Sequence, residues 1–464
     1  MPTFPNSTLQ NSTLQNGDAP DRQRRTVRWV VAIAALALLF DGYDLVVYGT
    51  VVSTFMQDPS QLGQLSAAQL GALGSYALMG VMVGALTAGA IGDRLGRRRM
   101  MLINIVWFSV GMAATAMAHD AATFGVWRFV TGLGVGALVA TAGAMIAEFA
   151  PAGKRNFYNA VVYSGVPAGG VLASVLAIIL SDAVTWRGLF WIGALPILFL
   201  FPLALVKLPE SPLWLLSRGR PAAGERVGFR ALAGKRYRLP TTLLGMMSFC
   251  GLLLTYGLNT WLPQIMAQYG YDKTYSLMFL LTLNFGAIIG GLLASRGADR
   301  LGAQRVIATT FGLAALSLVL LTLGFPLPVL LLCVAIAGVG TLGTQVLIYG
   351  FVSNYYVTSA RAAGVAWCAG FGRLGGIFGP LIGGLLISAG VETHVAFYVF
   401  GSIAVLGGLV TFFVPGKPTD AAMEPTPESD AAPSRAVTEG FVSEPWSGQT
   451  AAVAEKSTSI NGNE

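Results

Sequence analysis

An apolar run over residues 27–55 constrains this 464-residue chain more than any other feature, because it is long enough to cross a lipid bilayer as one helix. Asp41 and Asp44 lie well inside that run. A carboxylate at the centre of a membrane-spanning helix costs about 2.5–3.5 kcal/mol on insertion scales. The i, i+3 spacing puts both residues on one helical face, so both carboxylates can face the same water-filled cavity.

Two carboxylates so close together cannot both be ionised easily in a low dielectric. The pattern favours an acid pair that gains and loses a proton, as proton-coupled transport requires. The structural alternative is a pair of acids held by hydrogen bonds to neighbouring helices. Because acids inside membrane spans are usually functional, we interpret Asp41 and Asp44 as candidate proton-coupling residues.

The composition is that of a protein that crosses the membrane many times. Hydrophobic residues make up 54% of the chain and charged residues only 11%, whereas a soluble protein carries about 25% charged residues. The 58 glycines predict close helix packing, because small residues let two backbones approach each other. The three cysteines fall in apolar segments without metal-ligand or disulfide spacing, so we expect them to pack in the core. We expect no metal site, and no cofactor for a protein that the proton gradient drives.

Basic residues gather in alternate connections between the apolar segments. This positive-inside pattern places both termini in the cytoplasm and explains the net charge of +7 without nucleic acid. The first apolar run is too long for a signal peptide. We therefore expect a multi-pass membrane protein, with the lipid bilayer as its surroundings.

Twelve apolar segments can be identified. They cover residues 27–55, 67–91, 100–118, 123–148, 157–180, 187–206, 241–266, 274–295, 304–323, 327–352, 359–387 and 393–414. The expected fold is an all-α membrane protein with twelve transmembrane helices in two six-helix bundles. The expected parts are disordered cytoplasmic tails (1–26 and 415–464), two bundles (27–206 and 241–414) and a cytoplasmic linker (207–240).

A short loop sequence occurs twice. Asp93-Arg94-Leu95-Gly96 follows the second segment and recurs as Asp299-Arg300-Leu301-Gly302 after the eighth. Internal repetition on this scale is typical of secondary transporters, whose substrate site lies between the two halves near the membrane midplane.

Further motifs identify a family resemblance. They are Asp41-Gly42-Tyr43-Asp44, Arg128-Phe129-x-x-Gly132-x-Gly134-x-Gly136, Glu148-x-x-Pro151-x-x-x-Arg155, Tyr256-Gly-Leu-Asn-Thr-Trp261-Leu262-Pro263 and Arg361-Ala-x-Gly364-x-x-Trp367-x-x-Gly370-x-Gly372-Arg373. With the repeated loop, they make residues 27–414 resemble the major facilitator superfamily, and more narrowly its aromatic acid:proton symporters. This resemblance implies import of a benzoate- or hydroxybenzoate-type carboxylate by a monomer that the proton gradient drives. Ala303-Gln304 departs from the pattern, since members often carry a basic residue there.

Two arginines lie inside apolar segments. Arg128 is in the fourth segment and Arg373 is near the middle of the eleventh. An arginine keeps its charge and offers a bidentate fork that suits a carboxylate. We expect Arg373 to bind the substrate carboxylate and Arg128 to pair with the acids. The structural alternative is a fixed bridge from Arg128 to Asp41 or Asp44.

Other polar and aromatic residues of the spans are candidates for the substrate cavity, because a ring needs aromatic contacts and its hydroxyls need polar partners. The substrate-binding candidates are Tyr43, Asn259, Trp261, Gln345, Tyr349 and Trp367, and further cavity candidates are Phe40, Tyr256, Asn284 and Phe371. Ordinary packing is the alternative for each ring, whereas buried amides need partners within a membrane.

Charged residues at the helix ends are candidates for a gate that breaks when the bundles rock. They are Asp93, Arg94, Arg97, Glu148, Arg155, Asp299, Arg300 and Arg361. The alternative is a solvated loop with weak surface ion pairs.

The sequence leaves two rival functions open. One is a proton-coupled carrier of another small organic acid, a sugar or an exported drug, and the other is a sensor built on a carrier fold. An enzyme is not expected, because the sequence has no nucleophile–base or metal-ligand constellation.

Overall fold

The computed structural model describes residues 18–151, 155–180, 183–211, 214–215, 232, 235–356 and 358–416. All of them belong to one compact unit. Within these ranges, the side chains of residues 18–23, 89–90, 93, 155–156, 235–236 and 358–362 are not described. Most of the two predicted tails and most of the linker lie outside the described residues.

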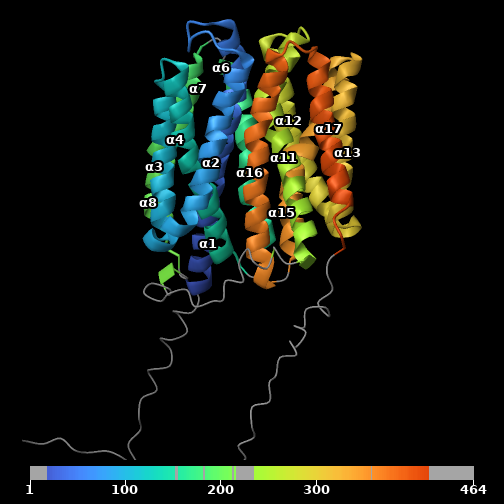
Figure 1. Ribbon diagram of the computed structural model, residues 1–464. Helices are drawn as coiled ribbons and strands as arrows, with labels where there is room; N and C mark the ends of the chain where they lie inside the picture. The colour runs from blue at the N-terminus through green and yellow to red at the C-terminus, as the bar shows by residue number, and fades with distance from the viewer. Residues whose placement is uncertain are drawn as a thin grey trace, which may run out of the picture. The chain divides into compact units, whose positions relative to one another are not determined.

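Every element among the described residues is helical (Figure 1). The first half contains α1 (Asp18–Gln57), α2 (Ala67–Leu95), α3 (Arg97–Ala116), α4 (Ala121–Phe149), α5 (Arg155–Tyr163), α6 (Gly165–Leu180), α7 (Trp186–Ala194) and α8 (Pro196–Lys207). The second half contains α11 (Lys235–Gln268), α12 (Lys273–Leu301), α13 (Ala303–Leu320) with η1 (Leu321–Leu323), α14 (Leu327–Gly338), η2 (Val339–Gly343), α15 (Thr344–Tyr355), α16 (Thr358–Ser388) and α17 (Thr393–Phe412).

The predicted number of membrane spans is confirmed. Twelve spans within the described residues are long and apolar enough to cross a bilayer. α5 with α6 makes the fifth span, α7 with α8 the sixth, and α14, η2 and α15 the tenth. Pro196 begins α8, and a π-helical turn with a non-helical Thr341 interrupts the tenth span.

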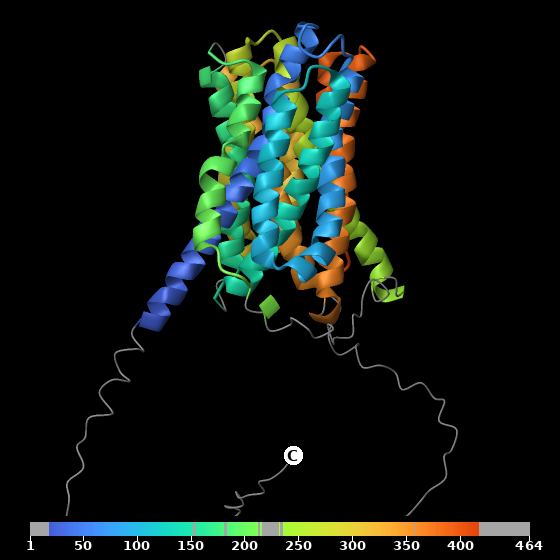
Figure 2. The same cartoon turned by 90° about the vertical axis from the view of Figure 1, so that its left-hand side faces the viewer.

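The ends of two helices differ from the predicted segments. Residues 18–26, predicted to belong to a disordered tail, form the start of α1, and residues 235–240, predicted as linker, form the start of α11. Hydropathy marks only the part of a helix that lies in lipid, so it misses charged turns that continue into water. The first turns of α1 extend below the neighbouring helices (Figure 2).

Side-chain caps start several helices at one end of the bundle. Ser66 and Gln69 form a capping box at the start of α2. Asp120 accepts a hydrogen bond from the backbone of Thr123 in α4, and Asp272 accepts one from Tyr275 in α12. These caps satisfy amide groups that the first helical turn leaves without partners. We call this end the upper end, and the end at which α1 begins, at the bottom of Figure 1, the lower end.

The two six-helix bundles meet along three pairs of helices, which are α1 with α11, α2 with α16, and α6 with α12. In the upper half, the Ser75 hydroxyl donates to the Ile377 carbonyl at 2.6 Å, and the Ala68 amide donates to Ser388 at 2.7 Å. A Cβ atom on Gly71 would collide with the Pro380 carbonyl, so the crossing of α2 and α16 requires a glycine there.

An apolar layer closes the boundary between the bundles near mid-height. Its buried members are Leu45, Leu78, Leu252, Tyr256 and Ile377, with Met79, Met82 and Leu374 packed against them. Leu45 lies one helical turn above Asp41, and Ile377 lies one turn above Arg373. The layer therefore separates these two charged residues from the upper end.

Candidate functional site

Asp44 of α1 and Arg128 of α4 form an ion pair inside the first bundle. Their side chains are 0% and 1% exposed. The Arg128 guanidinium also lies 5.4 Å from the centroid of the Tyr48 ring and 5.8 Å from that of Phe190. The pair is sealed from solvent in this conformation, so Arg128 lies beside Asp44 and not at an open surface.

Asp41 faces a different partner. It is buried, its Oδ1 atom accepts no hydrogen bond from any described group, and it interacts electrostatically with Arg373 of α16. An i, i+3 step turns a side chain by about 60° around the helix axis, which is enough to separate the two acids. Asp41 therefore faces the boundary between the bundles, whereas Asp44 faces the interior of the first bundle.

Arg373 lies at this boundary with a half-buried side chain. Its Nη1 atom donates to the Tyr256 hydroxyl of α11 at 3.3 Å. Within the described part of the chain, no carboxylate forms a contact ion pair with this guanidinium. An arginine held in place by a neutral phenol keeps its capacity to bind an anion.

Two more tyrosines lie near Arg373. Tyr349 of α15 interacts electrostatically with it, and Tyr163 of α5 interacts with Arg373, Asp41 and Tyr349. We call Tyr163, Tyr256 and Tyr349 the tyrosine cluster. It brings together phenol groups from both bundles, because α5 belongs to the first and α11 and α15 to the second.

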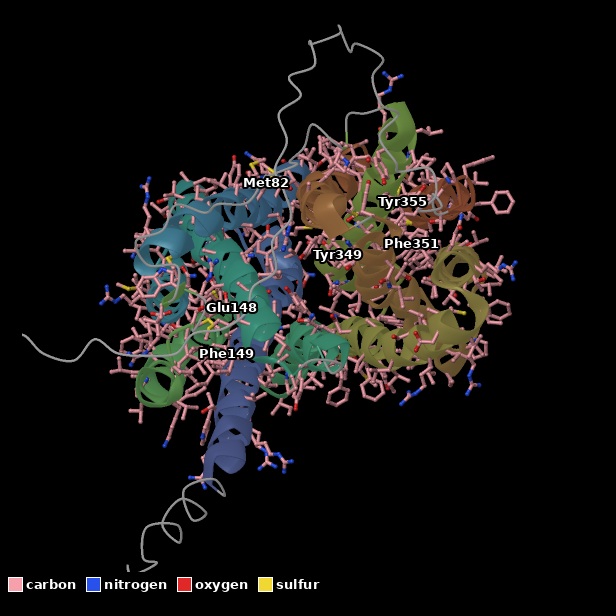
Figure 3. All side chains as sticks on the ribbon, turned by 90° about the horizontal axis from the view of Figure 1, so that it is seen from below. Met82, Glu148, Phe149, Tyr349, Phe351 and Tyr355 are labelled. Carbon is pink, nitrogen blue, oxygen red and sulfur yellow. The ribbon has the colours of Figure 1, made fainter. Side chains whose placement is uncertain are left out.

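Open space adjoins the cluster. Gly370 lies on the same stripe of α16 as Arg373, Leu374 and Ile377, and a Cβ atom on Gly370 would meet no atom within 4 Å. Figure 3, seen from the lower end, shows Tyr349 on the side of its bundle that faces the first bundle. Arg373 therefore lines a space between the bundles that lies below the apolar layer.

Gln345 adds an unsatisfied acceptor close to Tyr349. Its Nε2 atom donates to the Ser248 hydroxyl at 2.8 Å, whereas its buried Oε1 atom accepts no hydrogen bond from the described residues. Gln345 lies one helical turn above Tyr349, whose hydroxyl interacts with both Gln345 and Ser248. This arrangement offers a hydrogen-bond acceptor beside the tyrosine cluster.

The second bundle also holds a buried amide pair. Asn284 donates to the side-chain oxygen of Asn259 at 2.8 Å, and Asn259 donates to the Thr255 carbonyl at 2.7 Å. A Cβ atom on Gly49 of α1 would collide with the Asn259 carbonyl. The amide pair thus lies where α11 and α12 approach the first bundle.

Three substrate-binding candidates pack against their own bundles in this conformation. Tyr43 is fully buried and donates to the Leu189 carbonyl at 2.7 Å. Trp261 is fully buried and donates to the Pro380 carbonyl at 2.7 Å. Trp367 donates to the Thr241 carbonyl at 3.1 Å and stacks on Phe371 with ring centroids 5.5 Å apart. Each indole or phenol is thus already hydrogen-bonded to a backbone carbonyl.

The gating candidates Arg97 and Glu148 meet at the lower end, with Nε and Oε1 3.7 Å apart. Glu148 also accepts a hydrogen bond from the Ser211 hydroxyl. Glu210 accepts hydrogen bonds from the Arg98 amide at 2.9 Å and the Ser211 amide at 3.0 Å. These contacts tie α3, α4 and the segment after α8 together within one bundle. Glu148 lies at the lower end of α4 (Figure 3).

The other gating candidates are either exposed or have side chains that the structure does not describe. Arg94, Asp299 and Arg300 are exposed. The side chains of Asp93, Arg155 and Arg361 lie outside the described residues, so the structure does not place them.

The repeated loop has the same backbone in both halves. Gly96 and Gly302 have φ values of +94° and +89°. Two residues later, the Arg98 guanidinium donates to the Leu205 carbonyl of α8 at 2.6 Å, and the Gln304 amide donates to the Thr411 carbonyl of α17 at 2.9 Å. Both side chains satisfy carbonyls at the end of the last helix of their half. Gln304 therefore fulfils in the second half the structural role that Arg98 fulfils in the first.

Sequence reasoning missed Tyr163 and Ser248. A hydroxyl group inside an apolar segment is the available signal, because polar groups in a membrane need partners. That signal also marks many residues that only bond their own helix, such as Thr255 with the Gly251 carbonyl. Among the described residues, no group of three metal-ligating side chains lies together.

Comparisons with known proteins agree on a carrier family. Residues 34–297 and 280–454 match the model of the Major Facilitator Superfamily. The chain is 36% identical to the gentisate transporter of Corynebacterium glutamicum (82% of this chain, 85% of that protein) and 32% identical to the gallate transporter of Pseudomonas putida (82% and 90%). It is 29% identical to the benzoate transport protein of Acinetobacter baylyi (83% and 89%).

Solved structures agree on the fold. The crystal structure of a D-xylose-proton symporter superposes with a TM-score of 0.70 at 19% identity, covering 84% of this chain and 98% of that one. At this identity the likeness supports the fold alone.

Proposed function

The chain belongs to the major facilitator superfamily, among relatives that carry aromatic acids, and from this premise we propose that it imports a small aromatic carboxylate together with protons. It is a multi-pass membrane transporter, and the family is not one of enzymes. The substrate class that we propose is benzoate and its hydroxylated derivatives. A location in the bacterial inner membrane is part of the same proposal.

The half-buried guanidinium of Arg373 is the observation that carries this proposal. It faces the space between the bundles, and its hydrogen-bond partner among the described residues is a neutral phenol. A planar carboxylate matches the guanidinium fork with two parallel hydrogen bonds. A guanidinium at this depth in the membrane needs an anion or water beside it. Since no described carboxylate forms a contact ion pair with Arg373, an anionic substrate can take that place.

The surroundings of Arg373 suit an aromatic ring. The apolar layer supplies Leu374, Met79 and Met82, and the tyrosine cluster supplies ring faces and hydroxyls. Aromatic rings and sulfur atoms both pack well against a benzoate ring. The free Oε1 atom of Gln345 can accept a hydrogen bond from a ring hydroxyl near Tyr349.

Asp41 links substrate binding to protons in the proposed mechanism. Asp41 and the substrate carboxylate compete for the same guanidinium, because both are anions that approach Arg373. A proton on Asp41 removes this competition and leaves Arg373 to the substrate. Release of the proton restores the competition and favours departure of the substrate.

Asp44 and Arg128 supply a second charged pair in the same helix bundle. We propose that the pair keeps α1 and α4 in register and takes part in coupling when the bundles move. One proton with one monoanion moves no net charge, and a second proton adds about 2.3 kcal/mol of driving force per 100 mV.

The bundles are proposed to rock around this site. Basic residues gather at the lower end, including Arg94, Arg98 and Arg300, so we assign that end to the cytoplasm. In this conformation the apolar layer closes the path toward the upper end. We propose that the gating candidates Arg94, Arg97, Glu148, Asp299 and Arg300 form the cytoplasmic gate. Each chain carries a whole site, so a monomer suffices.

Uptake of labelled 4-hydroxybenzoate by cells, with and without an uncoupler of the proton gradient, tests the function. The expected result is accumulation that the uncoupler abolishes. Accumulation unaffected by the uncoupler would contradict proton coupling. Counterflow exchange in proteoliposomes is the companion measurement, because a sensor on this fold binds the ligand without exchanging it.

A further inference from the structure

A groove on the outer face of the first bundle is separate from the site at Arg373. It lies along α3, with walls from α4 and α8, and has a volume of about 620 Å³. Its lining includes Arg99, Ile103, Val106, Trp107, Val110 and Phe201. None of these residues belongs to the proposed substrate site or its gate.

The walls of the groove suit hydrocarbon. Ile103, Trp107 and Val110 are about half exposed, at 46%, 46% and 50%. The indole nitrogen of Trp107 already donates to the Val130 carbonyl at 2.8 Å, so this ring offers its apolar surface to an occupant. A polar ligand would find no free polar partner on these three side chains.

One end of the groove carries a positive charge. Arg99 is exposed at the lower end of α3, and its guanidinium takes part in none of the ion pairs or hydrogen bonds among the described residues. The two preceding arginines already have partners within the protein, since Arg97 pairs with Glu148 and Arg98 donates to the Leu205 carbonyl. Among the described residues, Arg99 is therefore free to meet an anion at this end of the groove.

The length of the groove matches one membrane leaflet. Arg99 and Gly111 are its first and last lining residues along α3, and a helix rises about 1.5 Å per residue, so they lie about 18 Å apart. Half of a hydrocarbon core of about 30 Å is about 15 Å. A single acyl chain that starts at the membrane surface therefore extends along the groove to about the midplane.

We propose that this groove binds an anionic phospholipid from the leaflet at the lower end. The phosphate pairs with Arg99, and one acyl chain lies along α3 against Val106 and Trp107. The proposal concerns a lipid and is independent of which substrate the protein carries. One basic residue near an anionic surface gives about a fivefold preference for anionic over neutral lipid.

The test uses the purified full-length protein and measures retained lipid by native mass spectrometry after exposure to equal amounts of phosphatidylglycerol and phosphatidylcholine. The wild type is expected to retain phosphatidylglycerol about fivefold more. Arg99→Gln is expected to lose the preference, and Arg99→Lys to keep it. Arg305→Gln is the matched control, because Arg305 occupies the equivalent loop position in the second half and lies outside the groove.

An Arg99→Gln protein that keeps the wild-type preference would overturn the proposal. Equal loss in Arg305→Gln would overturn it as well, because the effect would then come from general surface charge. Val106→Trp fills the groove and is expected to reduce retention of phosphatidylglycerol while Arg99 stays in place. Soluble glycerophosphate carries the phosphate group without acyl chains, so its binding shows whether the site recognises a lipid or only a free phosphate. Glycerophosphate binding as strong as that of the lipid, together with unchanged lipid retention in Val106→Trp, would show that the groove is not used.

Discussion

Asp41 of α1 and Arg373 of α16 interact electrostatically across the boundary between the two bundles, and among the described residues no contact ion pair joins them. Arg373 instead donates a hydrogen bond to Tyr256 at 3.3 Å. A buried acid and a half-buried guanidinium on different bundles respond to each other's charge, while each keeps the capacity to bind something else. Movement of the bundles changes their separation, so proton binding and bundle motion are physically linked through this pair.

Asp41→Asn is expected to abolish accumulation of 4-hydroxybenzoate while exchange continues. The amide has no charge to compete for Arg373 and cannot carry a proton. Proteoliposomes with an imposed pH gradient measure accumulation, and counterflow in the same vesicles measures exchange. We expect accumulation to fall at least tenfold and exchange to stay within about threefold of the wild type. Wild-type accumulation would exclude Asp41 from coupling.

Arg128→Gln is expected to destabilise the protein, because it leaves Asp44 buried without its counter-ion. Breaking a buried ion pair costs about 3–5 kcal/mol, whereas removing both charges is often nearly neutral. Asp44→Asn combined with Arg128→Gln should therefore recover most of the stability and still lack accumulation. Thermal unfolding midpoints in detergent give the comparison. A double variant as unstable as Arg128→Gln would show that the ion pair is not the source of the effect.

Arg373→Gln is expected to weaken substrate binding by about 10- to 150-fold, which corresponds to about 1.5–3 kcal/mol for a hydrogen bond to a charged group. Arg373→Lys keeps the charge but loses the bidentate fork, so its recovery should be partial. Binding of 4-hydroxybenzoate to purified protein is the measurement. Arg305→Gln serves as control, since it removes an exposed arginine outside the site. Equal binding by Arg373→Gln and this control would remove Arg373 from the site.

Two tyrosine variants separate recognition of the carboxylate from recognition of ring hydroxyls. Tyr256→Phe removes the hydrogen bond to Arg373, so it should weaken benzoate and hydroxybenzoates alike. Tyr349→Phe should weaken only hydroxylated rings, by about two- to tenfold, the value of one neutral hydrogen bond. Competition by benzoate, 4-hydroxybenzoate and 2,5-dihydroxybenzoate in uptake assays gives the ratios. Identical profiles for the two variants would contradict this division.

The fold could be predicted from the sequence because the bilayer imposes a simple rule. A backbone in lipid has to satisfy its own hydrogen bonds, so each long apolar segment becomes a helix. The twelve spans follow from this rule alone. Helix ends outside the lipid follow other rules, which is why the start of α1 at Asp18 was not predicted.

Which side chains contact each other in the site depends on the three-dimensional packing of the helices, and residue spacing in the sequence does not specify that packing. The i, i+3 spacing predicted Asp41 and Asp44 on one face of α1. Their side chains point in different directions around the helix, however, so that Asp41 faces Arg373 and Asp44 pairs with Arg128. Likewise, the packing of Tyr43 and Trp261 against backbone carbonyls depends on how neighbouring helices approach. Such contacts arise from tertiary packing between distant segments.

The most direct test of proton coupling is a pH electrode in a weakly buffered suspension of proteoliposomes. Addition of 4-hydroxybenzoate should make the external medium more alkaline with the wild-type protein, because protons enter with the anion. The Asp41→Asn protein should give no alkalinisation although it still exchanges the labelled acid. Alkalinisation of equal size in the Asp41→Asn vesicles, or none with the wild type during uptake, would contradict the account.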